Sequence, residues 1–298
     1  MKDSRKLFLS VIQLNLLVLL FHCTINANAQ SDTTDRSFLL ETSGIRSTYR
    51  DLATSPLYYT GYGLSLGLGW DWKKKQSESS VFFDLSGSIL RSVSPESNLI
   101  PSITRSYMAS ANFFTEYLRR IPLQNNRWRL FLGGSSNLSL PFRYNPSLGN
   151  SALGADPLLN LMGAGRVRFD VSRKEERTFS FWLISRQLVP VRRYFQLDLH
   201  AGLFNFNYRP GYAYTYDASI QGNDTRLLNY YFDNYKWSLN GWRIQTRLSF
   251  FRESQTGNGF QLFYAWEATV AKGRFEPLAL AIHKIGIRLN VQRKPRIK

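Results

Sequence analysis

The sequence WRIQTRLSFFRESQTGNGFQLFYAWEATV, residues Trp242–Val270, predicts the fold of this chain. Within Trp242–Phe250 and Phe260–Val270, every second residue except Thr246 is apolar or aromatic, while the residues between them include Arg243 and Glu267. A period of two indicates β-strands, because successive side chains of a strand point to opposite faces of its sheet. The polar link between the two runs contains glycine, so we expect a hairpin with one greasy and one charged face.

The same alternation recurs along the chain. It is clearest over Tyr62–Trp72, Tyr194–Asn207 and Ile282–Gln292, and a further strand is expected over Phe179–Leu188. Together these runs predict an all-β chain of about twelve antiparallel strands, the even number that a transmembrane barrel requires. If Tyr212–Asp217 is not a strand, ten strands become the expectation. A soluble β-sandwich would show the same alternation, so the membrane has to be argued from other features.

The N-terminus predicts export. A basic start is followed by an apolar run of about 15 residues over Leu7–Phe21 and by the small-residue site Ala27-Asn28-Ala29, which together are typical of a cleaved signal peptide. We therefore expect residues 1–29 to be removed and 30–298 to form a single barrel domain. Cys23 is the only cysteine and lies within the predicted signal, so the exported chain offers no disulfide or zinc–thiolate site.

Charge and aromatic content favour a membrane over a nucleic acid. The formal net charge is +17 and aromatic residues make up 15% of the chain, as expected where aromatic girdles meet a bilayer. No nucleic-acid-binding motif is present, and an exported protein has little access to nucleic acids. We expect anionic lipid, meaning lipopolysaccharide and phospholipid, to be the partner of the basic surface. The expected turns at one barrel end hold a basic rim, formed by Lys73, Lys74, Lys75, Arg119, Arg120, Arg127, Arg173, Lys174, Arg177, Arg209 and Arg252.

The predicted inward face carries charges of both signs. A charge inside a barrel must be paired or hydrated, because an isolated charge in a medium of low dielectric constant is costly. Two arrangements fit: a plug of salt bridges, or a wet pore with a basic lining that favours anions. We expect Glu267 to bridge the strand of Arg243 and Arg247 to that of Lys284 and Arg288. The candidate lumen-lining residues are Arg166, Arg168, Asp198, His200, Arg243, Arg247, Glu267, Lys284 and Arg288.

The sequence gives little support for an enzyme. Outer-membrane phospholipases and lipid A deacylases are barrels with a Ser-His pair two residues apart, and neither His200 nor His283 has a serine at that spacing. We therefore expect no catalytic residue, no metal ligand and no cofactor, and an interior hydrogen-bonding role for His200 beside Asp198. An outer-membrane lipid hydrolase is the third functional hypothesis, after a passive channel and a non-conducting binding barrel.

Alternation, aromatic strand ends and the signal peptide together make the exported chain resemble the broad class of Gram-negative outer-membrane β-barrel proteins. The resemblance implies a location in the outer membrane and a contact with the barrel-assembly machinery during insertion. The chain departs from many such barrels at its end, which is basic rather than aromatic over Arg293–Lys298.

Two functions follow from the barrel hypothesis. The first is a passive, porin-like channel for small solutes with a charged, arginine-rich lumen. The alternative is a non-conducting barrel that anchors or binds an unidentified protein through its outer loops, above all Ser219–Lys236.

Overall fold

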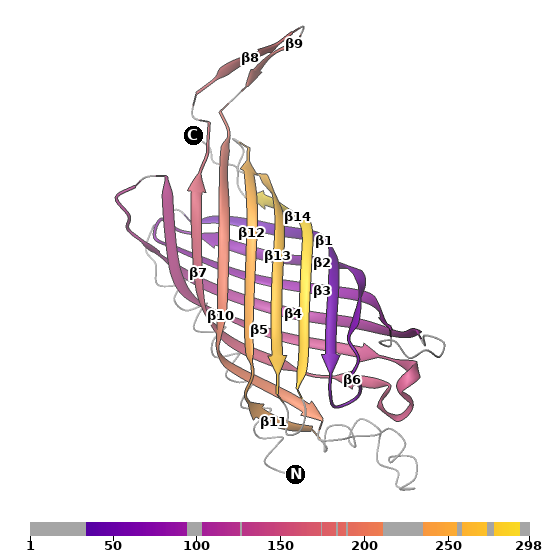
Figure 1. Cartoon of the computed structure of the whole chain (residues 1–298). Helices are drawn as coiled ribbons and strands as arrows, with labels where there is room; N and C mark the ends of the chain where they lie inside the picture. Colours follow the sequence, from indigo (N-terminus) through magenta and orange to yellow (C-terminus); the bar gives the residue numbers. More distant parts are fainter. Residues whose placement is uncertain are drawn as a thin grey trace.

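The chain folds into a closed antiparallel β-barrel (Figure 1). The computed structural model describes residues 34–93, 103–125, 127–173, 175–182, 184–188, 190–210, 235–254, 258–272 and 277–292. The predicted signal peptide, the Tyr212–Asp217 segment and the basic end of the chain lie outside these ranges. Most of the Ser219–Lys236 loop also lies outside them.

The main sheet has 12 strands, and without the short β6 and β11 ten remain to form the wall. Each wall strand pairs with the next, β7 joins β5 to β10, and β14 pairs with β1 to close the ring. A closed ring leaves no unpaired edge, which is what a sheet needs in order to span a bilayer. The wall strands are β1 (Asp35–Asp51), β2 (Tyr59–Lys73), β3 (Ser77–Val93), β4 (Ile103–Ile121), β5 (Trp128–Tyr144), β7 (Leu158–Asp170), β10 (Arg192–Pro210), β12 (Trp242–Glu253), β13 (Gly259–Ala271) and β14 (Leu278–Gln292). The remaining elements are the 3-10 helix η1 (Pro146–Ser151) and strands β6 (Leu153–Ala155), β8 (Arg177–Phe181), β9 (Ile184–Leu188) and β11 (Tyr235–Leu239).

The predicted all-β antiparallel barrel is confirmed, and its wall has the smaller of the two expected strand numbers. The expected wall strand over Phe179–Leu188 is wrong, because this segment folds into the separate hairpin β8–β9. The chain reverses at Trp182, whose φ is 54°, and each arm has only 5 residues, too few to cross a bilayer. No glycine, proline or asparagine marks this turn, so the sequence resembles a single strand.

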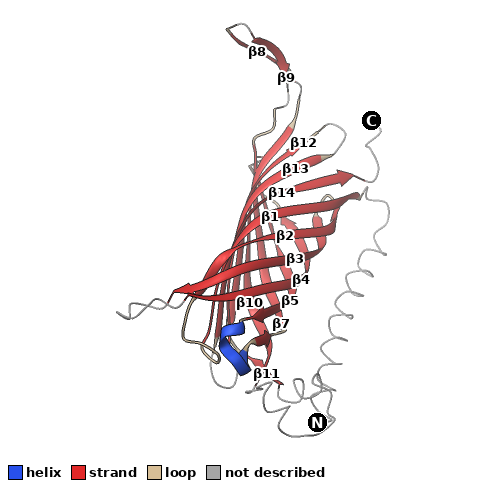
Figure 2. Ribbon diagram, turned by 90° about the vertical axis from the view of Figure 1, so that its right-hand side faces the viewer, coloured by secondary structure: helices blue, strands red, loops and turns tan. Residues whose placement is uncertain are grey.

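The two ends of the barrel differ (Figure 2). The hairpin β8–β9 projects from one end, here called the hairpin end, and η1 and β11 lie at the other, here called the helix end. Three links at the hairpin end, 74–76, 122–127 and 254–258, are short turns, and the fourth, 171–191, carries the hairpin β8–β9; the helix end has links of mixed length, of which 52–58 and 272–277 are short and 145–157 is longer. Because periplasmic turns of such barrels are short and outer loops longer, we assign the hairpin end to the periplasm. No helix among the described residues is long and apolar enough to span a membrane.

One member of the predicted basic rim belongs to the other end. Strand β10 continues to Pro210, so Arg209 lies near the helix end and not in a periplasmic turn, which corrects the sequence prediction. The register of β10 against β7 shifts between Gly202 and Phe204. This bulge reverses the alternation, so that Arg209 is buried inside the barrel.

The two faces of the wall differ as the alternation predicts. Large apolar side chains cover the outside, and Leu64 and Ile285 are each 70% exposed to the surroundings. The inner face of β2 carries glycines, which leave space above the strand. A Cβ at Gly67 would lie 2.4 Å from the ring of Phe82, and one at Gly69 2.6 Å from the same ring. The glycines therefore make room for an aromatic ring inside the barrel.

Candidate functional site: the barrel interior and its mouth

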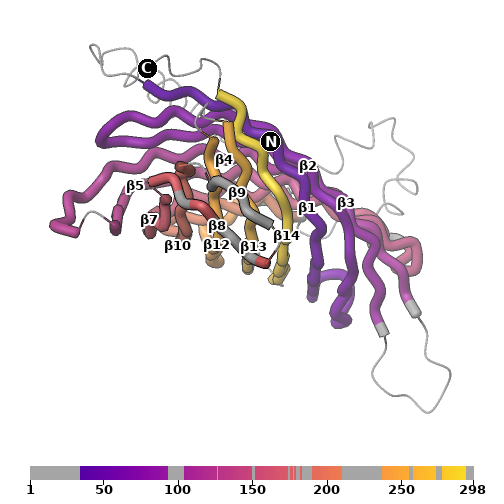
Figure 3. Tube along the Cα trace, turned by 90° about the horizontal axis from the view of Figure 1, so that it is seen from above, coloured from indigo at the N-terminus to yellow at the C-terminus, as the bar shows by residue number. Residues whose placement is uncertain are grey.

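The interior residues singled out from the sequence all lie on five consecutive wall strands (Figure 3). Their side chains are buried or half-buried, and each of them has a polar partner inside the barrel. They are Arg166 and Arg168 on β7, Asp198 and His200 on β10, Arg243 and Arg247 on β12, Glu267 on β13, and Lys284 and Arg288 on β14.

Arg166 holds three carboxylates in the lumen. Its guanidinium donates to Asp198 at 2.5 Å, to Glu116 at 2.6 Å and to Glu78 at 2.8 Å. Arg168, two residues further along β7, donates to both carboxylate oxygens of Glu78. Glu78 lies on β3 and Glu116 on β4, so these bonds pass over the inner face of β5 and tie separate parts of the wall together.

Glu41 on β1 forms a second centre. Arg247 donates to its two oxygens at 3.0 and 3.1 Å, and Arg288 donates to it at 2.7 Å. The Arg288 guanidinium also lies 4.5 Å from the ring centre of Phe82, which rests on the β2 glycines. The small residues of β2 thus determine where a cation of β14 sits.

The remaining pairs correct the role expected for Glu267. This carboxylate accepts hydrogen bonds from Arg243 at 2.5 Å and Gln245 at 2.9 Å, both on β12, and does not bridge to β14. Lys284 instead pairs with Asp84 on β3, at 3.0 Å from both oxygens. The geometry explains these pairs: Glu41 lies on β1 directly opposite Arg288 of the neighbouring β14, and the long Lys284 side chain extends along the inner face past β1 and β2 to Asp84 on β3.

Sequence reasoning missed an apolar layer inside the lumen. Towards the helix end, inward-facing side chains of several wall strands form a buried cluster with exposures from 0% to 6%. Its larger members include Tyr59 at 1%, Leu90 at 0% and Leu278 at 1%. The signal was present in the sequence, since the inward positions change from charged to apolar along β1 and β14. The cluster consists of Ile45, Tyr49, Tyr59, Leu90, Met108, Leu158, Ala271, Leu278, Leu280 and Ile282.

Beyond this layer, two arginines and two aspartates close the helix end. Arg143 donates to Asp51 at 2.6 Å and also to Asp156, while Arg209 lies 2.8 Å from Asp51 and 3.3 Å from Asp156. All four side chains are at most 7% exposed. Of these four residues the sequence analysis singled out only Arg209, as part of the basic rim, so this quartet was not foreseen.

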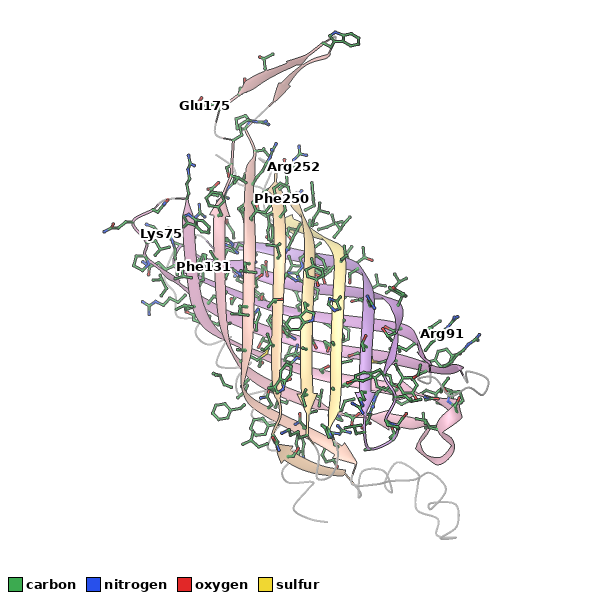
Figure 4. The ribbon with its side chains drawn as sticks, viewed as in Figure 1. Lys75, Arg91, Phe131, Glu175, Phe250 and Arg252 are labelled. Atoms are coloured by element: carbon green, nitrogen blue, oxygen red, sulfur yellow. The ribbon has the colours of Figure 1, made fainter. Side chains whose placement is uncertain are left out.

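The described part of the chain encloses two cavities that bear on function. One of about 150 Å³ lies inside the lumen among the ion pairs of Arg166, Glu41 and Lys284. The other, of about 680 Å³, opens at the hairpin end and is here called the vestibule. Its lining includes cations from the turns and strand ends, together with Phe131, Tyr194 and Phe251. Figure 4 shows Lys75 and Arg252 at this end of the barrel, while Arg91 lies at the opposite end of the β2–β3 hairpin.

His200 has a more elaborate environment than expected. Its Nδ1 lies 3.0 Å from the Ser135 hydroxyl, and its Nε2 lies 3.5 Å from the carboxylate of Glu116. The imidazole meets Phe114 edge-on, with ring centres 5.3 Å apart. Ser135 and His200 are 8% and 7% exposed, so this chain of groups is buried inside the barrel. Within the described ranges, no three His, Cys, Asp or Glu side chains are grouped so as to hold a metal ion.

Comparison with known proteins identifies the fold of this chain but assigns it to no family. No protein-family model matches the chain, and no curated protein matches it. Among solved structures, the outer membrane protease OmpT from Escherichia coli is similar with a TM-score of 0.51 at 8% identity, over 89% of this chain and 99% of that one. The transport unit of the Escherichia coli autotransporter AIDA-I matches with a TM-score of 0.39 at 9% identity, over 87% and 91% of the two chains.

The likeness to OmpT, at this identity, establishes the fold alone. The fold is that of Gram-negative outer-membrane β-barrels, as the sequence resemblance implies. Together with the apolar outer face of the wall, it places the chain in the outer membrane of a Gram-negative bacterium.

Proposed function

We propose that this barrel does not conduct and that it works as a membrane-anchored binding protein. The observation that carries the proposal is the buried apolar layer around Tyr59, Leu90 and Leu278, which crosses the lumen between the Glu41 ion pairs and the Asp51 quartet. A hydrophobic constriction excludes water, and ions do not cross where water is excluded.

The ion pairs support the same conclusion. Each arginine that a basic pore lining would use, including Arg166, Arg243 and Arg247, already has a carboxylate partner. Separating one buried pair costs about 3–5 kcal/mol, because it leaves an uncompensated charge. A barrel of this strand number is also close in size to the small barrels that side chains fill. Opening a path would therefore require breaking several pairs and the apolar layer together.

Conductance in a planar bilayer tests the proposal. We expect the folded, heat-modifiable protein to produce no discrete current steps, whereas an open porin of known conductance inserted in the same bilayer gives them. Discrete steps whose anion selectivity falls in an Arg247→Gln variant would overturn the proposal and establish the passive channel instead.

We also propose that the chain is not an enzyme. Ser135, His200 and Glu116 form a chain of polar contacts, but Glu116 is held by Arg166 and the serine is buried on the inner face of the wall, away from the lipid-facing side. Turnover of phospholipid or lipid A by the purified barrel, lost on Ser135→Ala, would contradict this. Lipopolysaccharide, phospholipid, the barrel-assembly machinery and a protein partner at the outer loops remain proposed partners.

A further inference from the structure

We propose that the vestibule is a binding site for a soluble, multiply charged oxyanion of the polyphosphate class. Nine Lys or Arg residues and four Asp or Glu residues line this cavity of about 680 Å³, so positive charge is in clear excess. The lining cations are Lys73, Lys74, Lys75, Arg120, Arg127, Arg129, Arg168, Arg192 and Arg252.

Several of these cations have no counter-charge among the residues that the structure describes. Arg129 pairs with Asp170 at 3.5 Å and Arg192 with Glu253 at 3.3 Å, and these two pairs use two of the lining carboxylates. Across the described part of the chain, no carboxylate lies within ion-pair distance of the cations Lys74, Lys75, Arg120, Arg127 and Arg252. They come from the β2–β3 turn, the β4–β5 turn with the end of β4, and the end of β12. A ligand with several separated negative charges can contact them at once.

The floor of the vestibule keeps the interior carboxylates away from these cations. Glu78 is used by Arg166 and Arg168. The Arg168 guanidinium lies 5.1 Å from the ring centre of Phe131 and 5.2 Å from that of Tyr194. Tyr194 also stacks on Phe251, with ring centres 4.5 Å apart. The floor is therefore a closed layer of rings and paired charge, and the unpaired cations face the open cavity.

Physical chemistry selects the ligand class. A cleft lined by one sign of charge with walls of low dielectric constant concentrates ions of the opposite sign. Guanidinium groups bind phosphate oxygens in a two-pronged fashion, and lysines add point charges without a geometric demand. A singly charged anion would satisfy only one of the three groups of cations, so several phosphates in one molecule fit the site better.

A bilayer headgroup fits the vestibule less well, because the cations of the vestibule line the inside of the barrel end and not its lipid-facing rim. Arg119 and Arg120 on β4 make the distinction experimentally accessible. Both are exposed, but alternation along the strand points Arg119 to the outer face, and only Arg120 lines the vestibule. Removing Arg120 should therefore affect a soluble ligand, and removing Arg119 should affect a lipid at the outer rim.

The test is titration calorimetry of inorganic tripolyphosphate into the folded barrel in a neutral detergent and a phosphate-free buffer. We expect saturable binding that the triple variant K75Q/R120Q/R127Q weakens about tenfold or more, because each lost contact is a charge-assisted one. The R119Q control should leave the affinity unchanged, and orthophosphate should bind more weakly than tripolyphosphate. Retained heat-modifiable gel mobility establishes that the variants fold, and R120Q alone provides a milder second variant.

Three results would overturn the inference. They are no binding of tripolyphosphate, an equal loss of affinity in R119Q and R120Q, and binding of phosphatidylglycerol in mixed micelles without binding of tripolyphosphate. The inference rests on the proposed function in one respect: if the lumen does not conduct, a ligand in the vestibule binds there and does not pass through the barrel. The two fail separately: current steps with tripolyphosphate binding retained would overturn the sealed barrel alone, and a silent barrel without binding would overturn the site alone.

Discussion

Arg166 and Arg120 are the same residue type on the inner face of the same wall, in opposite electrostatic situations. Arg166 is surrounded by three carboxylates at 2.5 to 2.8 Å, whereas Arg120 is exposed in the vestibule without an acidic partner among the described residues. Charge in the lumen is balanced and holds the strands in place, while charge at the mouth is unbalanced and available to a ligand. Net charge alone therefore does not distinguish an arginine that stabilises the fold from one that can bind a ligand. The number of carboxylates around each arginine does distinguish them.

The largest loss of stability should come from removing the lumen arginine, Arg166. Arg166→Gln leaves Glu78, Glu116 and Asp198 close together with less cationic compensation. Because a buried charge without its partner is strongly unfavourable, we expect the free energy of unfolding to fall by about 3–5 kcal/mol. Urea titration of the barrel in lipid bilayers, followed by tryptophan fluorescence, measures this. A loss of less than about 1 kcal/mol, as at exposed pairs, would mean that the lumen charges are hydrated and that the comparison fails.

A smaller effect is expected from the pair of Lys284 and Asp84. Asp84 keeps hydrogen bonds from Ser65 and Asn112 when the lysine is removed, so its negative charge is still partly stabilised. We therefore expect Lys284→Met to cost about 1.5–3 kcal/mol, the range for hydrogen bonds to charged groups.

A double-mutant cycle separates this pair from its surroundings. The double variant Lys284→Met/Asp84→Asn should lose less free energy of unfolding than the sum of the two single variants, since each single variant leaves one partner unpaired. Additive losses would show that the two side chains do not interact and would weaken the evidence for a plug of cross-barrel pairs.

Much of the architecture was predictable because alternation reports which face a residue occupies. It indicated the inward direction of Arg166, Arg247 and Arg288 without any knowledge of partners. The partners were not predictable, since Glu41 meets Arg247 across 206 positions of sequence and Arg288 across 247. Such meetings depend on how the ring closes, because closure makes β1 and β14 neighbours with Glu41 opposite Arg288 and brings Arg247 of β12 within reach of the same carboxylate.

Two local departures from alternation explain the other errors. The bulge between Gly202 and Phe204 reverses the inward face, so Arg209 is buried where a regular strand would expose it. The β8–β9 turn at Trp182 has no turn residue, so a hairpin was predicted as one strand. The vestibule itself was partly visible in the sequence as a basic rim, but only the structure separates the cations that line the cavity from those that face outward.

The smallest stability effect should come from the mouth, and it completes the comparison. Within the described ranges Arg120 has no carboxylate partner to lose, and the charged residues that line the vestibule with it are mostly other cations. We expect Arg120→Gln to change the free energy of unfolding by about 0.5 kcal/mol or less. At low ionic strength the change should be stabilising, because repulsion among the cations is relieved when screening is weak. Urea titration at low and at physiological salt measures both. A destabilisation comparable to that of Arg166→Gln would mean that Arg120 has a structural partner and that the mouth, like the lumen, is built from balanced charge.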